Sequence, residues 1–206
     1  MSRKLNFRVL AALVCIAIPY LGWAQSKAPS PLTVASLRAG LGKLQDIALT
    51  SGVNDVYFKG PEQSARIVTA LIQNADGSSR LVFFISMQDE ESNWIVVPTG
   101  DQEDAIVENE LDPDGYFRDV RFMNGTLGGQ DTTFLFVSTL DGPRYKSRAP
   151  SATISVETLQ SPLGDCCAPF EFVPILQFKT KAGYTDAAVA LKHELNIPLP
   201  AGYQPG

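Results

Sequence analysis

Histidine is almost absent from this sequence of 206 residues, in which His193 is the single example. A Ser-His-Asp hydrolase needs a histidine base beside its nucleophile, and a zinc site usually takes several histidine or cysteine ligands. The sequence also has no Gly-x-Ser-x-Gly elbow and no Ser-x-x-Lys motif. We therefore expect neither mechanism, and no cofactor. A mechanism based on two carboxylates stays open, because its acids need no local motif.

Basic residues are the second shortage. The chain has 17 lysines and arginines against 22 aspartates and glutamates, which gives a net charge of −5. Binding to nucleic acid requires a basic surface that neutralises phosphates, so we expect no nucleic-acid partner. After residue 24, no apolar run approaches the ~20 residues of a membrane-spanning helix. The sequence thus predicts no membrane span in the mature chain.

Cysteine is also scarce, with Cys15, Cys166 and Cys167 as the three examples. The Cα atoms of adjacent residues are about 3.8 Å apart, whereas those of bridged cysteines usually lie about 4.4–6.8 Å apart. The Cys166-Cys167 pair is therefore not an ordinary disulfide staple, and we interpret it as part of a rigid turn. A redox-sensitive vicinal disulfide, a soft-metal thiolate pair and an intermolecular bridge are the alternatives.

The N-terminus has the three parts of a secretory signal peptide. Three basic residues come first, residues 9–21 form an uncharged apolar stretch, and Gly22 and Ala24 place small residues at the −3 and −1 positions. We therefore predict a signal peptide over residues 1–24, cleaved near Ala24-Gln25, and a periplasmic or secreted protein. Cleavage would remove three basic residues and no acidic ones, so the net charge would change from −5 to −8.

The rest of the chain has the length of one domain. Residues 25–32 are rich in proline and serine and are predicted to be a disordered lead-in. Residues 33–200 are predicted to form a single globular domain, and residues 201–206 a C-terminal tail.

The predicted fold class is α+β, with a mainly antiparallel sheet of roughly eight strands between an N-terminal and a C-terminal amphipathic helix. Apolar residues recur at helical spacing from Val34 to Ala48, after a Thr33 cap, and again from Tyr184 to Leu195. Short apolar or alternating runs, separated by turn-forming residues, predict strands at 53–59, 66–73, 80–87, 94–97, 116–123, 132–139, 152–159 and 170–181.

An acidic connection covers residues 101–115. Within it, Glu110, Asp112 and Asp114 recur at every second position before a glycine, as in the front half of a calcium-binding loop. The twelfth position of that loop is Arg121, where a bidentate glutamate is required. We interpret the segment as a solvated Asp-Pro-Asp-Gly turn, and a weak calcium site at these three residues is the alternative.

Arg144, Lys146 and Arg148 alternate, so in an extended chain they share one face. They are candidates for contact with an acidic partner. The simpler interpretation is a solvated edge whose charges discourage the addition of another strand.

Together these features predict an exported, non-enzymatic module that binds an unknown protein or small ligand. One alternative is a carboxylate-dependent enzyme, with residues 101–114 as the place for its acids. Another is a redox-responsive envelope protein built on Cys166 and Cys167.

Overall fold

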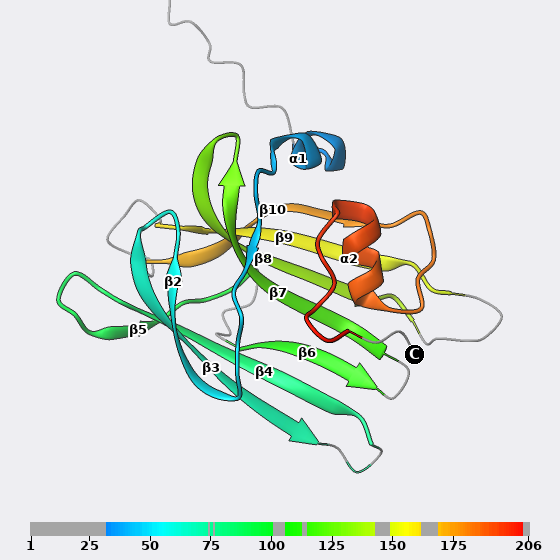
Figure 1. Cartoon of the computed structure of the whole chain (residues 1–206), viewed down its shortest axis with the longest axis horizontal. Helices are drawn as coiled ribbons and strands as arrows, with labels where there is room; N and C mark the ends of the chain where they lie inside the picture. Colours follow the sequence, from blue (N-terminus) through cyan, green and yellow to red (C-terminus); the bar gives the residue numbers. More distant parts are fainter. Residues whose placement is uncertain are drawn as a thin grey trace, which may run out of the picture. The chain divides into compact units, whose positions relative to one another are not determined.

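The structure, a computed structural model, describes residues 32–73, 75, 77–100, 106–112, 115–142, 149–161 and 169–203 (Figure 1). The predicted signal peptide, its cleavage site and most of the predicted lead-in lie outside these ranges. Within the described residues, no helix has the length and apolar character that crossing a membrane would require.

Strands dominate the described residues, as the predicted α+β class with a mainly antiparallel sheet requires. There are two short helices and ten strands: α1 (Val34–Gly40), β1 (Gln45–Asp46), β2 (Gly52–Phe58), β3 (Gln63–Gln73), β4 (Ser79–Gln88), β5 (Trp94–Val96), β6 (Ile106–Asp112), β7 (Gly115–Leu127), β8 (Gln130–Leu140), β9 (Ala152–Gln160), β10 (Glu171–Lys179) and α2 (Ala187–Leu195).

The strands form one sheet in the order β10-β9-β8-β7-β6-β4-β3-β2, with β1 beside β7 and β5 beside β4. All of these pairings are antiparallel, as the hairpin-length connections predicted. The prediction of a solvated connection was wrong for residues 106–112, because β6 pairs with both β4 and β7 there. The acidic residues of this segment are typical of a loop, which is why the sequence did not predict a strand here.

The N-terminal helix is much shorter than its apolar spacing predicted. It starts at a Thr33 capping box and ends at Gly40, and the chain then runs along β7. The backbone N–H of Gly42 donates to the carbonyl oxygen of Thr126 at 3.0 Å. A Cβ at Gly42 would lie 1.9 Å from Thr126 Oγ1, so any larger residue would force the Thr126 side chain to move. Gly40 is therefore the last residue of the helix, and Gly42 allows the chain to approach β7 closely.

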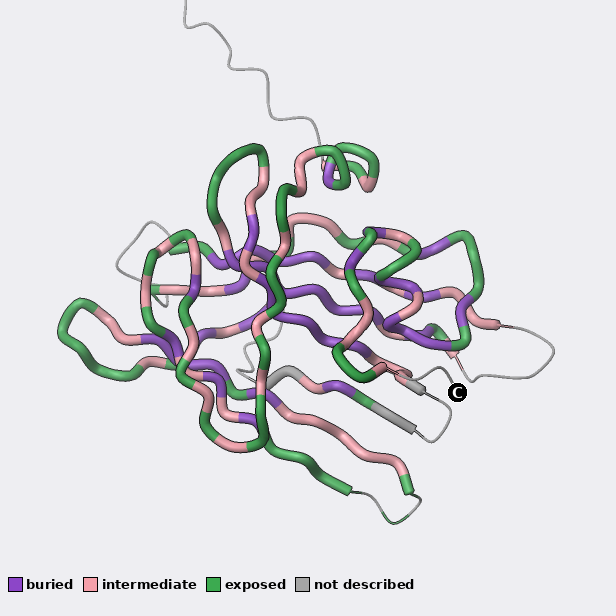
Figure 2. The backbone as a smooth tube through the Cα atoms, in the orientation of Figure 1, coloured by how far each residue is buried: buried purple, intermediate pink, exposed green. Residues whose placement is uncertain are grey.

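Two apolar cores lie on opposite faces of β7, β8 and β9. On β8, Phe134 and Phe136 face the core under the helices, whereas Leu135 and Val137 face the core on the other side. This alternation is the ordinary two-residue period of a strand. Figure 1 shows α2 lying over β7 and β8, and Figure 2 shows buried residues along these central strands.

The second core is enclosed by the sheet itself. Phe58 on β2 and Phe172 on β10 belong to the terminal strands of the sheet, yet their ring centroids are 5.9 Å apart in an edge-to-face arrangement. Side chains of β3 and β4 pack into the same core as those of β7 and β8. The sheet therefore curls until its two ends meet across this core.

The outer surface of β2–β5 differs from that of β7–β9. All the large apolar side chains that are exposed among the described residues lie on these four strands, at Val53, Tyr57, Leu71, Ile72, Phe84, Trp94 and Val96. Arg66 lies 4.2 Å from the centre of the Trp94 ring and ion-pairs with Asp55. We call β2–β5 the bare half of the sheet and β7–β9, with α1 and α2, the covered half.

Candidate functional site

β7 changes its neighbour halfway along its length, and the sheet forks at this point. Near its start β7 pairs with β6 through Arg118 and Glu110, and towards its end it pairs with β1 through Met123 and Asp46. Between these pairings the backbone N–H of Val120 donates to the side-chain oxygen of Asn109. A side chain thus takes the place of a ladder hydrogen bond, and a gap opens beside residues 119–121.

A cavity of about 220 Å³ fills this fork, and we call it the Asp119 chamber. Its walls come from residues 46–49, β4, β6, β7 and residues 200–201 near the C-terminus. Ile47, Leu81 and Phe83 supply apolar surface, and Asp119 and Arg121 supply charge. Drug-sized ligands usually occupy cavities of about 300–1,000 Å³, so this chamber suits a smaller molecule.

Asp119 is the most unusual side chain of the chamber. It is 1% exposed, and neither carboxylate oxygen has a hydrogen-bond partner among the described residues. Its cross-strand neighbour Ser138 is also buried without a partner for its hydroxyl. Buried polar groups are normally hydrogen-bonded, and leaving one unpaired costs about 1–3 kcal/mol. A carboxylate kept in this state within an otherwise ordinary core is a candidate for a ligand contact.

Burial raises the pKa of Asp119 to about 7. The nearby charge of Arg121 acts in the opposite direction, whereas Asp186 and Asp46 add to the increase. The carboxyl group is therefore about half protonated at neutral pH. It can donate a proton or accept a cation under ordinary conditions.

Two neighbouring carboxylates, by contrast, are engaged in holding the fold together. Asp46 accepts a hydrogen bond from Arg121 at 2.8 Å, and Arg121 also donates to the carbonyl oxygen of Pro198 at 3.0 Å. Asp186 caps α2 by accepting from the backbone N–H of Ala188 at 2.7 Å, and its other oxygen accepts from the N–H of Tyr116 at 3.0 Å. Arg121 and Asp186 thereby join β7 to β1, α2 and the C-terminal segment.

Two tyrosines complete the polar surroundings of Asp119. Tyr116, which lines the chamber, stacks on Tyr203 with ring centroids 6.3 Å apart. Burial and the charge of Asp119 raise the pKa of Tyr116, and burial and Asp186 raise the pKa of Tyr203 to about 12. Both phenols therefore stay protonated and neutral at physiological pH.

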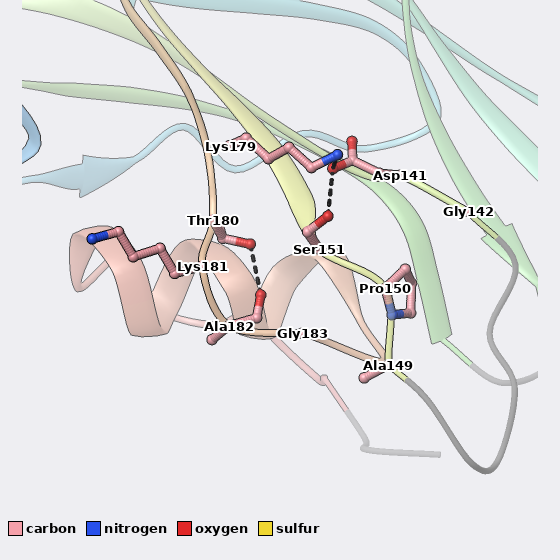
Figure 3. A pocket seen from close by; sticks show the side chains of 10 residues that line it. All are labelled: Asp141, Gly142, Ala149, Pro150, Ser151, Lys179, Thr180, Lys181, Ala182 and Gly183. Atoms are coloured by element: carbon pink, nitrogen blue, oxygen red, sulfur yellow. Dashed lines mark hydrogen bonds and ion pairs between the residues drawn. The ribbon is translucent and has the colours of Figure 1, made fainter.

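A second pocket, of about 590 Å³, lies beside the ends of β8 and β10 and the start of β9 (Figure 3). Its carboxylate, Asp141, accepts from Ser151 Oγ at 2.9 Å and Thr153 Oγ1 at 2.6 Å, and ion-pairs with Lys179 at 3.1 Å. Burial opposes ionisation of Asp141, but these three partners together lower its pKa. This carboxylate is fully engaged, and among the described residues that line this pocket no buried side-chain polar atom is without a partner, in contrast to the Asp119 chamber.

The residues proposed from sequence are only partly described by the structure. Glu110 lies on β6 opposite Arg118, and Asp112 lies opposite Gly115. Among the described residues, no group of three or more histidine, cysteine, aspartate or glutamate side chains is placed to hold a metal ion. The remaining candidates lie outside the described residues: Asp114, Arg144, Lys146, Arg148, Cys166 and Cys167.

His193, the single histidine, contacts a tyrosine hydroxyl near the end of α2. Its side chain is 68% exposed, and Nδ1 lies 2.6 Å from the hydroxyl of Tyr184. That hydroxyl also donates to Glu194 at 2.6 Å, and Glu194 ion-pairs with Arg38 of α1. The cluster connects the two helices.

Sequence reasoning missed Asp119. Its signal lies in residues 116–123, where a strand pattern places Asp119 and Arg121 on one face with Met123. Two charges on the apolar face of a central strand are uncommon, because burial of a charge is costly without a partner. This local conflict could have identified the site.

No protein-family model and no curated protein matches this sequence. A solved structure described as the crystal structure of CarG is similar in fold, with a TM-score of 0.58. The alignment covers 72% of this chain and 94% of the CarG chain at 12% sequence identity. At this identity the similarity concerns the fold alone.

Proposed function

We propose that this chain is an exported, non-enzymatic binding module that holds a small ligand in the Asp119 chamber. The observation that supports the proposal is a 1%-exposed carboxylate that lines a cavity and has no hydrogen-bond partner among the described residues. A bound ligand that donates to this group would remove the cost of its isolation. Apolar walls with a few convergent polar groups are the usual composition of small-molecule sites.

A ligand screen tests the binding part of the proposal. Purified protein is screened by thermal unfolding against small organic molecules, and we expect a subset to raise the melting temperature by mass action. Asp119→Asn should abolish the shift. Asp141→Asn, which alters the carboxylate of the other pocket, is the matched control and should retain it. If no molecule stabilises the protein, or if the hits depend on Asp141 instead, the chamber is not the binding site.

Export has a separate test. The full chain is expressed in a bacterium with two membranes, the cells are fractionated, and the N-terminus of the mature protein is sequenced. We expect periplasmic protein that begins at Gln25. Cytoplasmic protein with an intact N-terminus would contradict export and leave the binding proposal in place.

A carboxylate-dependent enzyme is the second candidate, favoured by the pKa of Asp119 near 7. A general acid works best with a pKa near the working pH. The two candidates differ in the fate of a ligand from the screen. A binding module returns it unchanged after prolonged incubation, whereas an enzyme yields a product, and Asp119→Asn stops its formation. Mass spectrometry of the recovered ligand distinguishes these outcomes.

A further inference from the structure

The charges around the Asp119 chamber are unbalanced. The charges of Asp46 and Asp186 disfavour ionisation of Asp119, and the charge of Arg121 favours it. The guanidinium of Arg121 donates its hydrogen bonds to Asp46 and to the carbonyl oxygen of Pro198, not to Asp119. Ionised Asp119 therefore has a negative surplus around it, and no donor among the described residues lies in hydrogen-bond contact with it.

This surplus discriminates between classes of ligand. An anion would meet the carboxylates of Asp46 and Asp119, which both line the chamber, so like-charge repulsion disfavours it. A metal ion needs several ligands, but Asp46 is bound by Arg121 and Asp186 by α2 and Tyr116. An ammonium group needs one carboxylate partner, and it would offset the charge that burial makes costly.

The walls define the rest of the ligand. Phe83 is 2% exposed, and with Leu81 and Ile47 it gives the chamber an apolar side. A volume of about 220 Å³ corresponds to roughly seven water molecules at ~30 Å³ each. A chain of a few carbons with one charged end fits both the size and the lining.

We propose that the Asp119 chamber binds a small organic cation, with its ammonium group against the Asp119 carboxylate and its apolar part against Leu81 and Phe83. This inference rests on the proposed small-ligand function and specifies the ligand class. In this proposal the Asp119 carboxylate binds the ammonium group, and Arg121 holds the chamber walls in place through Asp46 and Pro198.

Proton release follows from this assignment. The groups around Asp119 are Arg121, Asp46, Asp186, Tyr116 and Tyr203. The pKa of Asp119 is raised to about 7, so this carboxyl group titrates in the neutral range. A cation binds the ionised carboxylate, so below pH 7 its binding expels the proton. Affinity for an amine that stays charged should rise about tenfold between pH 6 and pH 8.

Three probes of similar size test the charge of the ligand: n-butylammonium, 1-butanol and butyrate. Isothermal titration calorimetry of the purified protein should show binding of n-butylammonium, at least tenfold weaker binding of 1-butanol and none of butyrate. At pH 6, the heat of n-butylammonium binding should vary with the ionisation enthalpy of the buffer, because a proton is released.

Two variants locate the effect. Asp119→Asn keeps the shape of the side chain and should lose n-butylammonium binding at every pH. Asp55→Asn makes the same change on the exposed face of β2 and should behave like the parent protein. Circular dichroism and the unfolding transition establish that both variants are folded. Leu81→Phe adds bulk to the wall and should weaken binding while leaving Asp119 in place.

The outcomes separate the two proposals. If 1-butanol or butyrate binds as tightly as n-butylammonium, or if affinity for the cation is independent of pH or of Asp119, the cation assignment is wrong and the chamber still binds small ligands. If none of the probes binds and the wider screen is also negative, the proposed function itself fails.

Discussion

The covered and bare halves of the sheet differ in how deeply they bury the same kinds of side chain. Phe136 on β8 is fully buried beneath the helices, whereas Phe84 on β4 is 37% exposed on an outer face. The Arg121–Asp46 ion pair has an arginine that is 7% exposed, and the arginine of the Arg66–Asp55 pair is 36% exposed. The difference indicates that residues in the covered half determine stability, and that the bare half tolerates change.

The largest expected effect comes from truncating a phenylalanine in each half. Phe136→Ala removes a ring from a closed core and should destabilise the protein by about 3–5 kcal/mol. Phe84→Ala should cost less than half of that amount, because part of the ring already contacts water. Urea denaturation of both variants measures the contrast. Equal losses would mean that the outer face of the bare half is covered in solution.

The pH dependence of Asp119 should be nearly as large. Below pH 4 both the folded and the unfolded chain hold its proton, and between pH 4 and pH 7 the unfolded chain releases it first. The folded state should therefore lose up to about 4 kcal/mol of stability as the pH rises through this range.

Asp119→Asn should remove this loss and make the protein more stable than the parent at pH 8. Asp141→Asn is the control, and its effect on the pH dependence of stability should have the opposite sign, because the pKa of Asp141 is lowered in the folded state. The parent gains stability from Asp141 as the pH rises through the acid range, and the variant lacks that gain. Urea denaturation of the parent and both variants at pH 4 and pH 8 measures these changes in the free energy of unfolding. An Asp119→Asn curve parallel to the parent's would show that Asp119 ionises normally.

The smallest contrast concerns the two ion pairs. Asp46→Ala leaves the nearly buried Arg121 with one fewer partner and should cost about 1–3 kcal/mol. Asp55→Ala breaks an exposed pair and should cost about 0–1 kcal/mol. Chemical denaturation at low and high salt distinguishes them, because salt screens the exposed pair more strongly. If Asp55→Ala lost more stability than Asp46→Ala, the bare half would contribute more to stability than the covered half, contrary to the expectation.

The sequence predicted the sheet because hairpins and apolar strands are local patterns. It predicted a C-terminal helix up to Leu195, which is where α2 ends, before the left-handed conformation of Asn196. It failed at α1, where helical spacing continues past Gly40 but tertiary pairing with β7 prevails. It also failed at β6, whose acidic residues resemble those of a loop.

The candidate site could not be predicted from local sequence patterns. The chamber depends on β6 and β1 sharing one edge of β7, and pairings between distant segments leave no spacing in the sequence. Asp119 was visible as a charge within a strand, but its lack of a partner follows from the positions of Arg121, Asp46 and Asp186.

The fork at β7 also bears on the order of folding. Arg121 is separated by 75 residues from Asp46 and by 77 from Pro198, so the chamber is closed by contacts that span most of the domain. The β2–β3–β4 meander, in contrast, joins strands that follow one another along the chain. Loop-closure entropy makes such distant contacts slow to form. The bare half is therefore expected to form early and the chamber last, so a chain that has completed its hairpins remains unable to bind until both of its ends reach β7.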